Sequence, residues 1–113
     1  MRLLIAVIAA SAALSITMTP AKAQSFSCME ESTLNAAEQR VCKSPWLGAM
    51  DERLDSWYRR ALERARYFDQ TSELRAAQRS WIASRDQCGG SFWCIRRHYS
   101  ERIRTLRSYV EHV

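Results

Sequence analysis

Cysteine and histidine are the residues of this chain best suited to metal or redox chemistry. Cys88 and Cys94 close a short segment, CGGSFWC, and His98 follows four residues after the second cysteine. Thiolates and imidazoles bind zinc, but this spacing is not that of a zinc finger. Redox-active cysteines are usually separated by two residues, whereas five separate Cys88 from Cys94. We therefore interpret the segment as a structural disulfide and expect no metal and no cofactor.

The N-terminal sequence indicates export, which favours oxidised cysteines. Met1-Arg2 precedes a largely apolar stretch over 3–18, and Ala21-Lys22-Ala23 has the small-x-small pattern that signal peptidase cleaves. We predict a signal peptide over 1–23 and a periplasmic or secreted domain over 24–113, without a lipoprotein cysteine at the cleavage position. The apolar stretch is shorter than the roughly 20 residues of a membrane span. No stable membrane insertion is expected after cleavage, and an uncleaved anchor is the alternative.

The predicted mature domain is small and only mildly basic. Removing residues 1–23 from the 113-residue chain leaves 90 residues, enough for one domain with a small core. Arg2 and Lys22 leave with the signal peptide, which has no acidic residue, so the formal charge falls from +5 to +3. The charge of the whole chain therefore overstates how basic the exported protein is.

All four cysteines lie in the mature domain, and an even number in a small exported domain indicates two disulfides. Cys28 and Cys42 bracket the first predicted helix, and closing their 15-residue loop would contribute about 3 kcal/mol. Cys88 and Cys94 flank a turn between helices, where a bond would contribute about 2 kcal/mol. These positions favour the local pairings 28–42 and 88–94 over the two crossed alternatives.

Helix signals recur along the mature domain, and no strand pattern competes with them. Asn35 with Glu38 predicts a capping box for a first helix that ends near Cys42. Ser44-Pro45 predicts the start of a second helix that runs to about Tyr67.

Two further helices follow the break at 69–72. We predict a third that ends at Cys88 with Leu74, Ala77, Trp81 and Ser84 on one face, and a fourth that begins near Phe92. Apolar residues at helical spacing mark the inner faces of the second and fourth helices. These are Leu47, Met50, Leu54, Trp57, Tyr58, Ala61, Leu62 and Ala65, and then Ile95, Tyr99, Ile103, Leu106 and Val110. The fold class is therefore an all-α, disulfide-stapled bundle of about three to four helices behind a signal peptide.

No arrangement of residues in the sequence points to an enzyme. Nucleophilic catalysis needs a base with an oriented partner, but the only histidines are His98, interpreted as a surface side chain, and His112 at the C-terminus. Carboxylate pairs such as Asp51 and Asp55 lie among arginines and fit helical ion pairs. We expect a protein without catalytic residues.

Arginines on the second and fourth predicted helices raise the question of nucleic-acid binding. Acidic residues are interleaved with them, the net charge is modest, and an exported protein seldom meets nucleic acid, so we do not expect such a partner. Anionic envelope polymers or lipid headgroups fit better. The arginines are Arg59, Arg60, Arg64, Arg66, Arg96, Arg97, Arg102, Arg104 and Arg107.

Several polar residues share a helix face with predicted core residues. Arg85 lies four residues after Trp81, and Arg102 lies three after Tyr99. We interpret them as amphipathic side chains that cover the core, with their charges paired to Asp51, Asp55 or Asp86. A binding role is the alternative. The predicted network comprises Asp51, Tyr58, Gln78, Trp81, Arg85, Asp86, Tyr99 and Arg102.

Three parts of the mature domain form a recognisable pattern: CKSPWLGAMD over 42–51, LRAAQRSWIASRDQC over 74–88, and the spaced residues Cys94, Tyr99, Arg102, Ile103 and Leu106. Over about residues 28–107 the chain resembles the LprI-type lysozyme inhibitor domain. The resemblance implies a secreted or envelope-attached helical domain that inhibits lysozyme and so protects bacterial peptidoglycan. It implies no catalytic residues. The chain differs from the family's namesake in having no lipoprotein-type cysteine, and its charge of +3 is a poor match for strongly basic animal lysozymes.

Two functions are therefore expected. The first is an exported inhibitor that binds lysozyme or a related peptidoglycan-cleaving enzyme. The alternative is a non-enzymatic periplasmic or secreted module that contacts the cell envelope or a host partner.

If the chain is an inhibitor, the segment around the second disulfide is the predicted contact. Phe92 and Trp93 are aromatic anchors of the kind that dominate interfaces. Arg96 and Arg97 follow them and suit a cleft whose catalytic groups are carboxylates. The competing interpretation is that Trp93 packs against Trp81 in the core.

Overall fold

The structure, a computed structural model, describes residues 26–112 and has an all-α fold. The predicted signal peptide lies outside the described residues. A 3-10 helix, η1 (Glu31–Thr33), precedes four α-helices: α1 (Ala36–Lys43), α2 (Pro45–Tyr67), α3 (Thr71–Asp86) and α4 (Phe92–Glu111). No helix of residues 26–112 has both the length and the apolar composition needed to cross a membrane.

The helix starts follow the local signals in the sequence. Asn35 accepts a hydrogen bond from the backbone N–H of Glu38, whose side chain accepts from the backbone N–H of Asn35, so the capping box is complete. Ser44 caps α2 through its hydroxyl oxygen, and Pro45 occupies the first turn. Ser91 caps α4 in the same way. Each cap satisfies a backbone donor that the helix leaves free.

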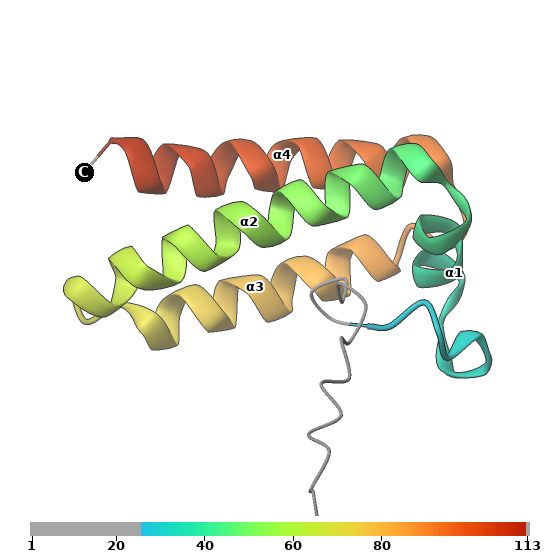
Figure 1. The fold of residues 1–113 in the computed structure, drawn as a ribbon, viewed down its shortest axis with the longest axis horizontal. Coiled ribbons are helices and arrows are strands. Elements are labelled where there is room, and N and C mark those ends of the chain that lie inside the picture. Colours follow the sequence, from blue (N-terminus) through green and yellow to red (C-terminus); the bar gives the residue numbers. More distant parts are fainter. Residues whose placement is uncertain (1–25, 113) are drawn as a thin grey trace, which may run out of the picture.

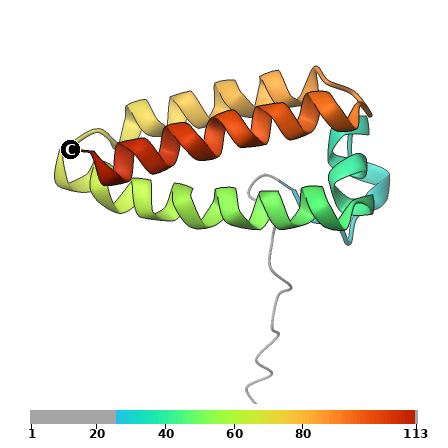
Figure 2. The ribbon, with the colours of Figure 1, turned by 90° about the horizontal axis from the view of Figure 1, so that it is seen from above.

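Helices α2, α3 and α4 form an elongated bundle, and α1 crosses one end of it (Figure 1). The chain runs away from α1 along α2, returns along α3 and runs away again along α4, so α2 and α4 point the same way (Figure 2). The turn between α3 and α4 therefore lies beside α1, and the turn between α2 and α3 lies at the opposite end. We call these the α1 end and the opposite end.

The apolar core lies mainly between α1, α2 and α4. The predicted stripes of α2 and α4 provide most of its buried side chains, and Ala37 and Val41 of α1 close the end. The prediction of a small all-α bundle with disulfides is confirmed. The buried apolar side chains of α2 and α4 are Leu47, Leu54, Ala61, Ala65, Ile95, Tyr99, Ile103 and Leu106.

The predicted inner face of α3 is wrong in part. Ala77 and Ser84 are exposed, whereas Gln78 and Arg85 are buried. The helix is turned relative to its apolar pattern because two long polar side chains fill the space that faces α2 and α4. An apolar pattern cannot reveal such a face, since it treats a buried arginine as a surface residue.

Both local disulfides are present. Cys28 is bonded to Cys42, and Cys88 is bonded to Cys94. The first joins the segment before η1 to the last turn of α1, and the second spans the turn that contains Gly89. Gly89 has φ +56°, a left-handed conformation that glycine adopts without steric cost. Both bonds therefore lie at the α1 end.

Candidate functional site

A chain of buried polar groups links three helices at the α1 end. The hydroxyl of Tyr99 on α4 donates to Asp51 Oδ1 on α2 at 2.7 Å, and Arg85 Nη1 on α3 donates to Tyr99 Oη at 3.2 Å. Arg85 also forms an ion pair with Asp86, with Nη2 2.9 Å from Oδ1. The Arg85 side chain has no solvent exposure. These hydrogen bonds therefore hold α2, α3 and α4 in one relative position.

Burial dominates the electrostatics of this cluster. Desolvation raises the pKa of Asp51 above its usual value, although the hydrogen bond from Tyr99 and the charge of Arg85 partly oppose this. Desolvation and the Asp51 charge both raise the pKa of Tyr99, so its hydroxyl stays a donor. Burial alone would lower the pKa of Arg85, but Tyr99 and Asp86 raise it overall. The arginine is therefore a fixed cation at the centre of the network.

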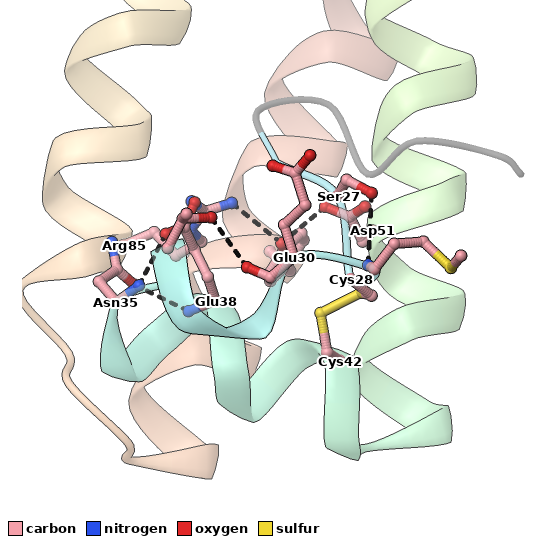
Figure 3. The surroundings of a disulfide bond; sticks show 11 residues. Ser27, Cys28, Glu30, Asn35, Glu38, Cys42, Asp51 and Arg85 are labelled. Atoms are coloured by element: carbon pink, nitrogen blue, oxygen red, sulfur yellow. Dashed lines mark hydrogen bonds between the residues drawn. A yellow bond between two sulfur atoms is a disulfide. The ribbon is translucent and has the colours of Figure 1, made fainter. Parts of the chain in front are cut away.

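The N-terminal segment covers this network. The Phe26 ring lies 5.1 Å from the Arg85 guanidinium carbon, and the Trp81 ring lies 5.4 Å from it. Figure 3 shows Cys28, bonded to Cys42, beside Asp51. The Cys28–Cys42 disulfide therefore ties the segment that contains Phe26 to α1. This structural role of the disulfide was not predicted from the length of the loop that it closes.

A second polar pair joins α3 to α4 further along the bundle. Arg102 Nε donates to Gln78 Oε1 at 2.9 Å, so Arg102 pairs with an amide and not with one of the carboxylates predicted for it. Burial lowers the pKa of Arg102, and Tyr58 partly offsets this. Its Nη2 is buried with no hydrogen-bond partner among residues 26–112. The eight predicted network residues thus divide into a cluster of Asp51, Arg85, Asp86 and Tyr99, on which the Trp81 ring packs, and the pair of Gln78 and Arg102, which Tyr58 influences electrostatically.

His98 lies against the second disulfide, and Trp81 is bonded to its backbone. The Trp81 indole N–H donates to the backbone carbonyl of His98 at 3.0 Å, and its ring packs edge-on against Tyr99. The His98 side chain is half-buried against Cys88 and Cys94, so its interpretation as a surface residue is wrong. The contact of this ring with Cys94 follows from their spacing of four residues on α4, whereas its contact with Cys88 depends on the α3–α4 turn, which helical periodicity does not describe.

The four predicted contact residues lie at the start of α4, with Phe92 and Trp93 inside the loop closed by the Cys88–Cys94 disulfide and Arg96 and Arg97 just after it. Trp93 is 71% exposed, so it does not pack against Trp81 in the core. Arg96 lies over the Trp93 ring at 5.5 Å, and Arg97 is exposed. Phe92 is half-buried, packs on the core and meets the Trp93 ring edge-on at 5.2 Å. Trp93, Arg96 and Arg97 therefore form an exposed surface, and Phe92 supports it from the core side.

Two exposed apolar residues at the α1 end were not among the predicted contacts. Trp46, at the start of α2, is 60% exposed, and Met29 is 78% exposed. The parallel directions of α2 and α4 place Trp46 and Trp93 at the same end of the bundle (Figure 1). Arg40 of α1 lies over the Phe92 ring at 5.7 Å and adds a cation there. The sequence offered one signal for the exposure of Trp46. Pro45 marks the first turn of the second helix, and residues in the first turn of a helix are often exposed.

The opposite end also exposes aromatic and cationic groups, but around a hollow. The hollow has a volume of about 450 Å³ and lies between the end of α2 and Val110 of α4. Arg64, Tyr67 and Phe68 are among its lining residues, and the Arg64 guanidinium lies over the Phe68 ring at 5.2 Å. Composition alone therefore does not distinguish the two ends.

Comparison with known proteins identifies the family of the chain. The family described as "Lysozyme inhibitor LprI" matches residues 19–106, which include both disulfides and the Asp51 cluster. The chain belongs to this family. It is 32% identical over 90 residues to proteins named "Lipoprotein LprI" from Mycobacterium bovis and from two strains of Mycobacterium tuberculosis.

The match to these relatives is partial. The aligned region is 77% of this chain but only 43% of each mycobacterial protein, so the chain spans less than half their length. No solved structure matches the chain. Family membership agrees with the resemblance seen in the sequence, and the family description concerns inhibition of an enzyme.

Proposed function

We propose that this protein is exported and inhibits lysozyme or a related peptidoglycan-cleaving enzyme without catalytic activity of its own. The family description supports the inhibitory role, and the relatives named as lipoproteins support export. The signal-like sequence over 1–23 also supports export. The two disulfides fit an oxidising compartment such as the periplasm or the extracellular space.

The α1 end is the proposed binding surface, and the observation that carries this is the exposure of Trp93 beside a disulfide. Tryptophan and arginine are the residues that most often dominate binding energy at interfaces. Trp93 and Arg96 already stack on each other, and Phe92 supports them from the core. The Cys88–Cys94 bond keeps the preceding turn ordered, so docking costs little conformational entropy.

The chemistry of the target fits a cationic, aromatic surface. Glycosidases of the lysozyme kind use two carboxyl groups on either side of the scissile bond. Arg96 and Arg97 are exposed and offer charge-assisted hydrogen bonds to such groups, and Trp93 offers an apolar surface beside them. Local charge of this kind is compatible with a target that is basic overall, because exposed charges more than about 10 Å apart are screened.

An inhibition assay tests the proposal. The purified, oxidised protein is added in increasing amounts to several lysozymes and peptidoglycan-cleaving enzymes, and clearing of a peptidoglycan suspension is followed. We expect at least one enzyme to be inhibited with a defined stoichiometry. Clearing at the uninhibited rate by every enzyme would overturn the inhibitory function and favour an envelope or host interaction module.

A further inference from the structure

The imidazole of His98 lies against both sulfurs of the second disulfide. Its Nδ1 is 3.3 Å from Cys88 Sγ and 3.9 Å from Cys94 Sγ. The potential ligand atoms of these three residues all lie within 4.8 Å of one another, and no other such group occurs among residues 26–112. All three side chains are half-buried, so a small reductant and an ion can both reach them.

These distances are close to those of a tetrahedral zinc site. Zinc–sulfur bonds of about 2.3 Å and zinc–nitrogen bonds of about 2.1 Å place sulfur and nitrogen ligands about 3.6 Å apart. The two observed sulfur–nitrogen distances lie on either side of that value. We propose that reduction of Cys88–Cys94 converts the α3–α4 turn into a zinc site with Cys88, Cys94 and His98 as its ligands.

The fold allows this change with a small movement. The two sulfurs must separate from bonding distance to about 3.8 Å, the spacing of thiolates on one zinc ion. Gly89 and Gly90 lie between the cysteines, and a Cβ added at either would meet no atom within 4 Å, so the turn has room to adjust. Cys94 and His98 are one helical turn apart on α4, and the Trp81 bond to the His98 carbonyl holds that turn.

The chemistry balances with a dithiol as reductant. The dithiol gives two electrons and two protons and becomes a disulfide, and Cys88 and Cys94 become thiols. Zinc then displaces both thiol protons. His98 Nδ1 lies 2.9 Å from the Cys94 carbonyl oxygen, which can only accept, so in the oxidised protein Nδ1 carries the imidazole proton and donates it to that oxygen. Binding of the ion through Nδ1 breaks this hydrogen bond and moves the proton to Nε2. Three protein ligands leave a fourth position for water.

Cobalt binding to the reduced protein provides the test. The full chain is reduced with a dithiol, freed of reductant without oxygen and titrated with Co²⁺, whose visible bands report tetrahedral thiolate ligation. We expect one ion per chain, displaced by Zn²⁺ and not bound by the oxidised protein. In the same sample, zinc should protect Cys88 and Cys94 from alkylation while Cys28 and Cys42 react. Equal alkylation of all four cysteines would overturn the proposal.

Two variants separate this site from unspecific thiol binding. His98→Gln should weaken Co²⁺ binding by about tenfold or more, since a ligand is lost. A variant with both Cys28→Ser and Cys42→Ser should bind as tightly as the wild type. Unchanged binding by His98→Gln, or loss of binding in the double serine variant with helical content retained, would place the ion elsewhere.

Discussion

The two ends of the bundle differ in how they are held together. At the α1 end, two disulfides, an added helix and the buried Arg85 cluster fix the positions of α2, α3 and α4. At the opposite end, the described residues of the α2–α3 turn are held by non-covalent contacts, namely hydrogen bonds and the stacking of Arg64 and Tyr67 on Phe68. Gln70 donates from its backbone to the Ala65 carbonyl oxygen at 2.7 Å, and Tyr109 donates to the Gln70 side chain at 2.6 Å.

The difference in rigidity between the two ends bears on which of them is the binding surface. Both ends expose aromatic side chains with arginines stacked on them, such as Trp93 with Arg96 and Phe68 with Arg64. Among the described residues, only the α1 end has an exposed aromatic side chain, Trp93, next to a disulfide. Because ordering a flexible surface opposes binding, the more rigid end is the better candidate for tight association.

The largest expected effect is the loss of Arg85. Arg85→Ala should lower the free energy of unfolding by about 3–5 kcal/mol, because it leaves a cavity and deprives Asp51 and Asp86 of a buried cation. Urea unfolding followed by circular dichroism measures this. Arg79→Ala, on the exposed face of the same helix, is the control and should change stability by less than about 0.5 kcal/mol. Similar values for both variants would show that the polar network does not secure the α1 end.

Removal of the disulfides should have the next largest effects. Replacing Cys28 and Cys42 together with serine should cost about 3 kcal/mol, and replacing Cys88 and Cys94 together should cost about 2 kcal/mol, because the first pair closes the longer loop. Thermal unfolding of the two variants tests this order. The reverse order would mean that constraint of the α3–α4 turn matters more than loop length.

A smaller effect should appear in the dependence of stability on pH. The pKa of Asp51 is raised above 3.8, so the folded state holds this proton more tightly than the unfolded state. Its contribution is therefore greatest below pH 3.8 and falls as the pH rises through the folded pKa. Asp51→Asn should remove this fall, so the stability of the wild type relative to the variant should decrease from low to neutral pH. A constant difference in unfolding free energy across this range would contradict the assignment.

The smallest effect belongs to the opposite end. Tyr109→Phe removes one exposed hydrogen bond to Gln70 and should cost about 1 kcal/mol or less. Hydrogen exchange of the α2–α3 turn should still become faster, because this bond links the turn to α4. A loss comparable to that of Arg85→Ala would show that the opposite end is as tightly held as the α1 end.

The sequence predicted the parts of the structure that depend on local signals. Asn35 and Ser44 marked helix starts, the spacing of Leu47 and Leu54 gave the inner face of α2, and the cysteine positions gave the pairings. The inner face of α3 was predicted in part: Gln78, Trp81 and Arg85 were expected to cover the core, whereas the inward placement of Ala77 and Ser84 was wrong. The complete burial of Arg85 depends on Tyr99, itself bonded to Asp51, which reaches it only after folding. A helical period shows which residues share a face, but not which partners will neutralise a charge on it.

The candidate surface was predicted in part. The residues on either side of Cys94 were identified from their types, but the exposure of Trp93 and the supporting role of Phe92 required the fold. His98 was interpreted as a surface side chain although its spacing of four residues places it beside Cys94, and its contact with Cys88 follows from the α3–α4 turn. Turns between helices bring side chains together in ways that periodicity within a helix cannot describe.

The most direct test of the proposed binding surface compares matched variants at the two ends. One variant carries Trp93→Ala, Arg96→Ala and Arg97→Ala at the α1 end. The other removes the same kinds of side chain, with Tyr67→Ala, Arg60→Ala and Arg66→Ala at the opposite end.

Inhibition constants against the same lysozyme are measured for both variants after circular dichroism shows equal helical content. We expect the α1-end variant to inhibit about 30-fold less well, the loss of a strong interface residue, and the opposite-end variant to inhibit like the wild type. Full inhibition by the folded α1-end variant would contradict the account and place the binding surface elsewhere.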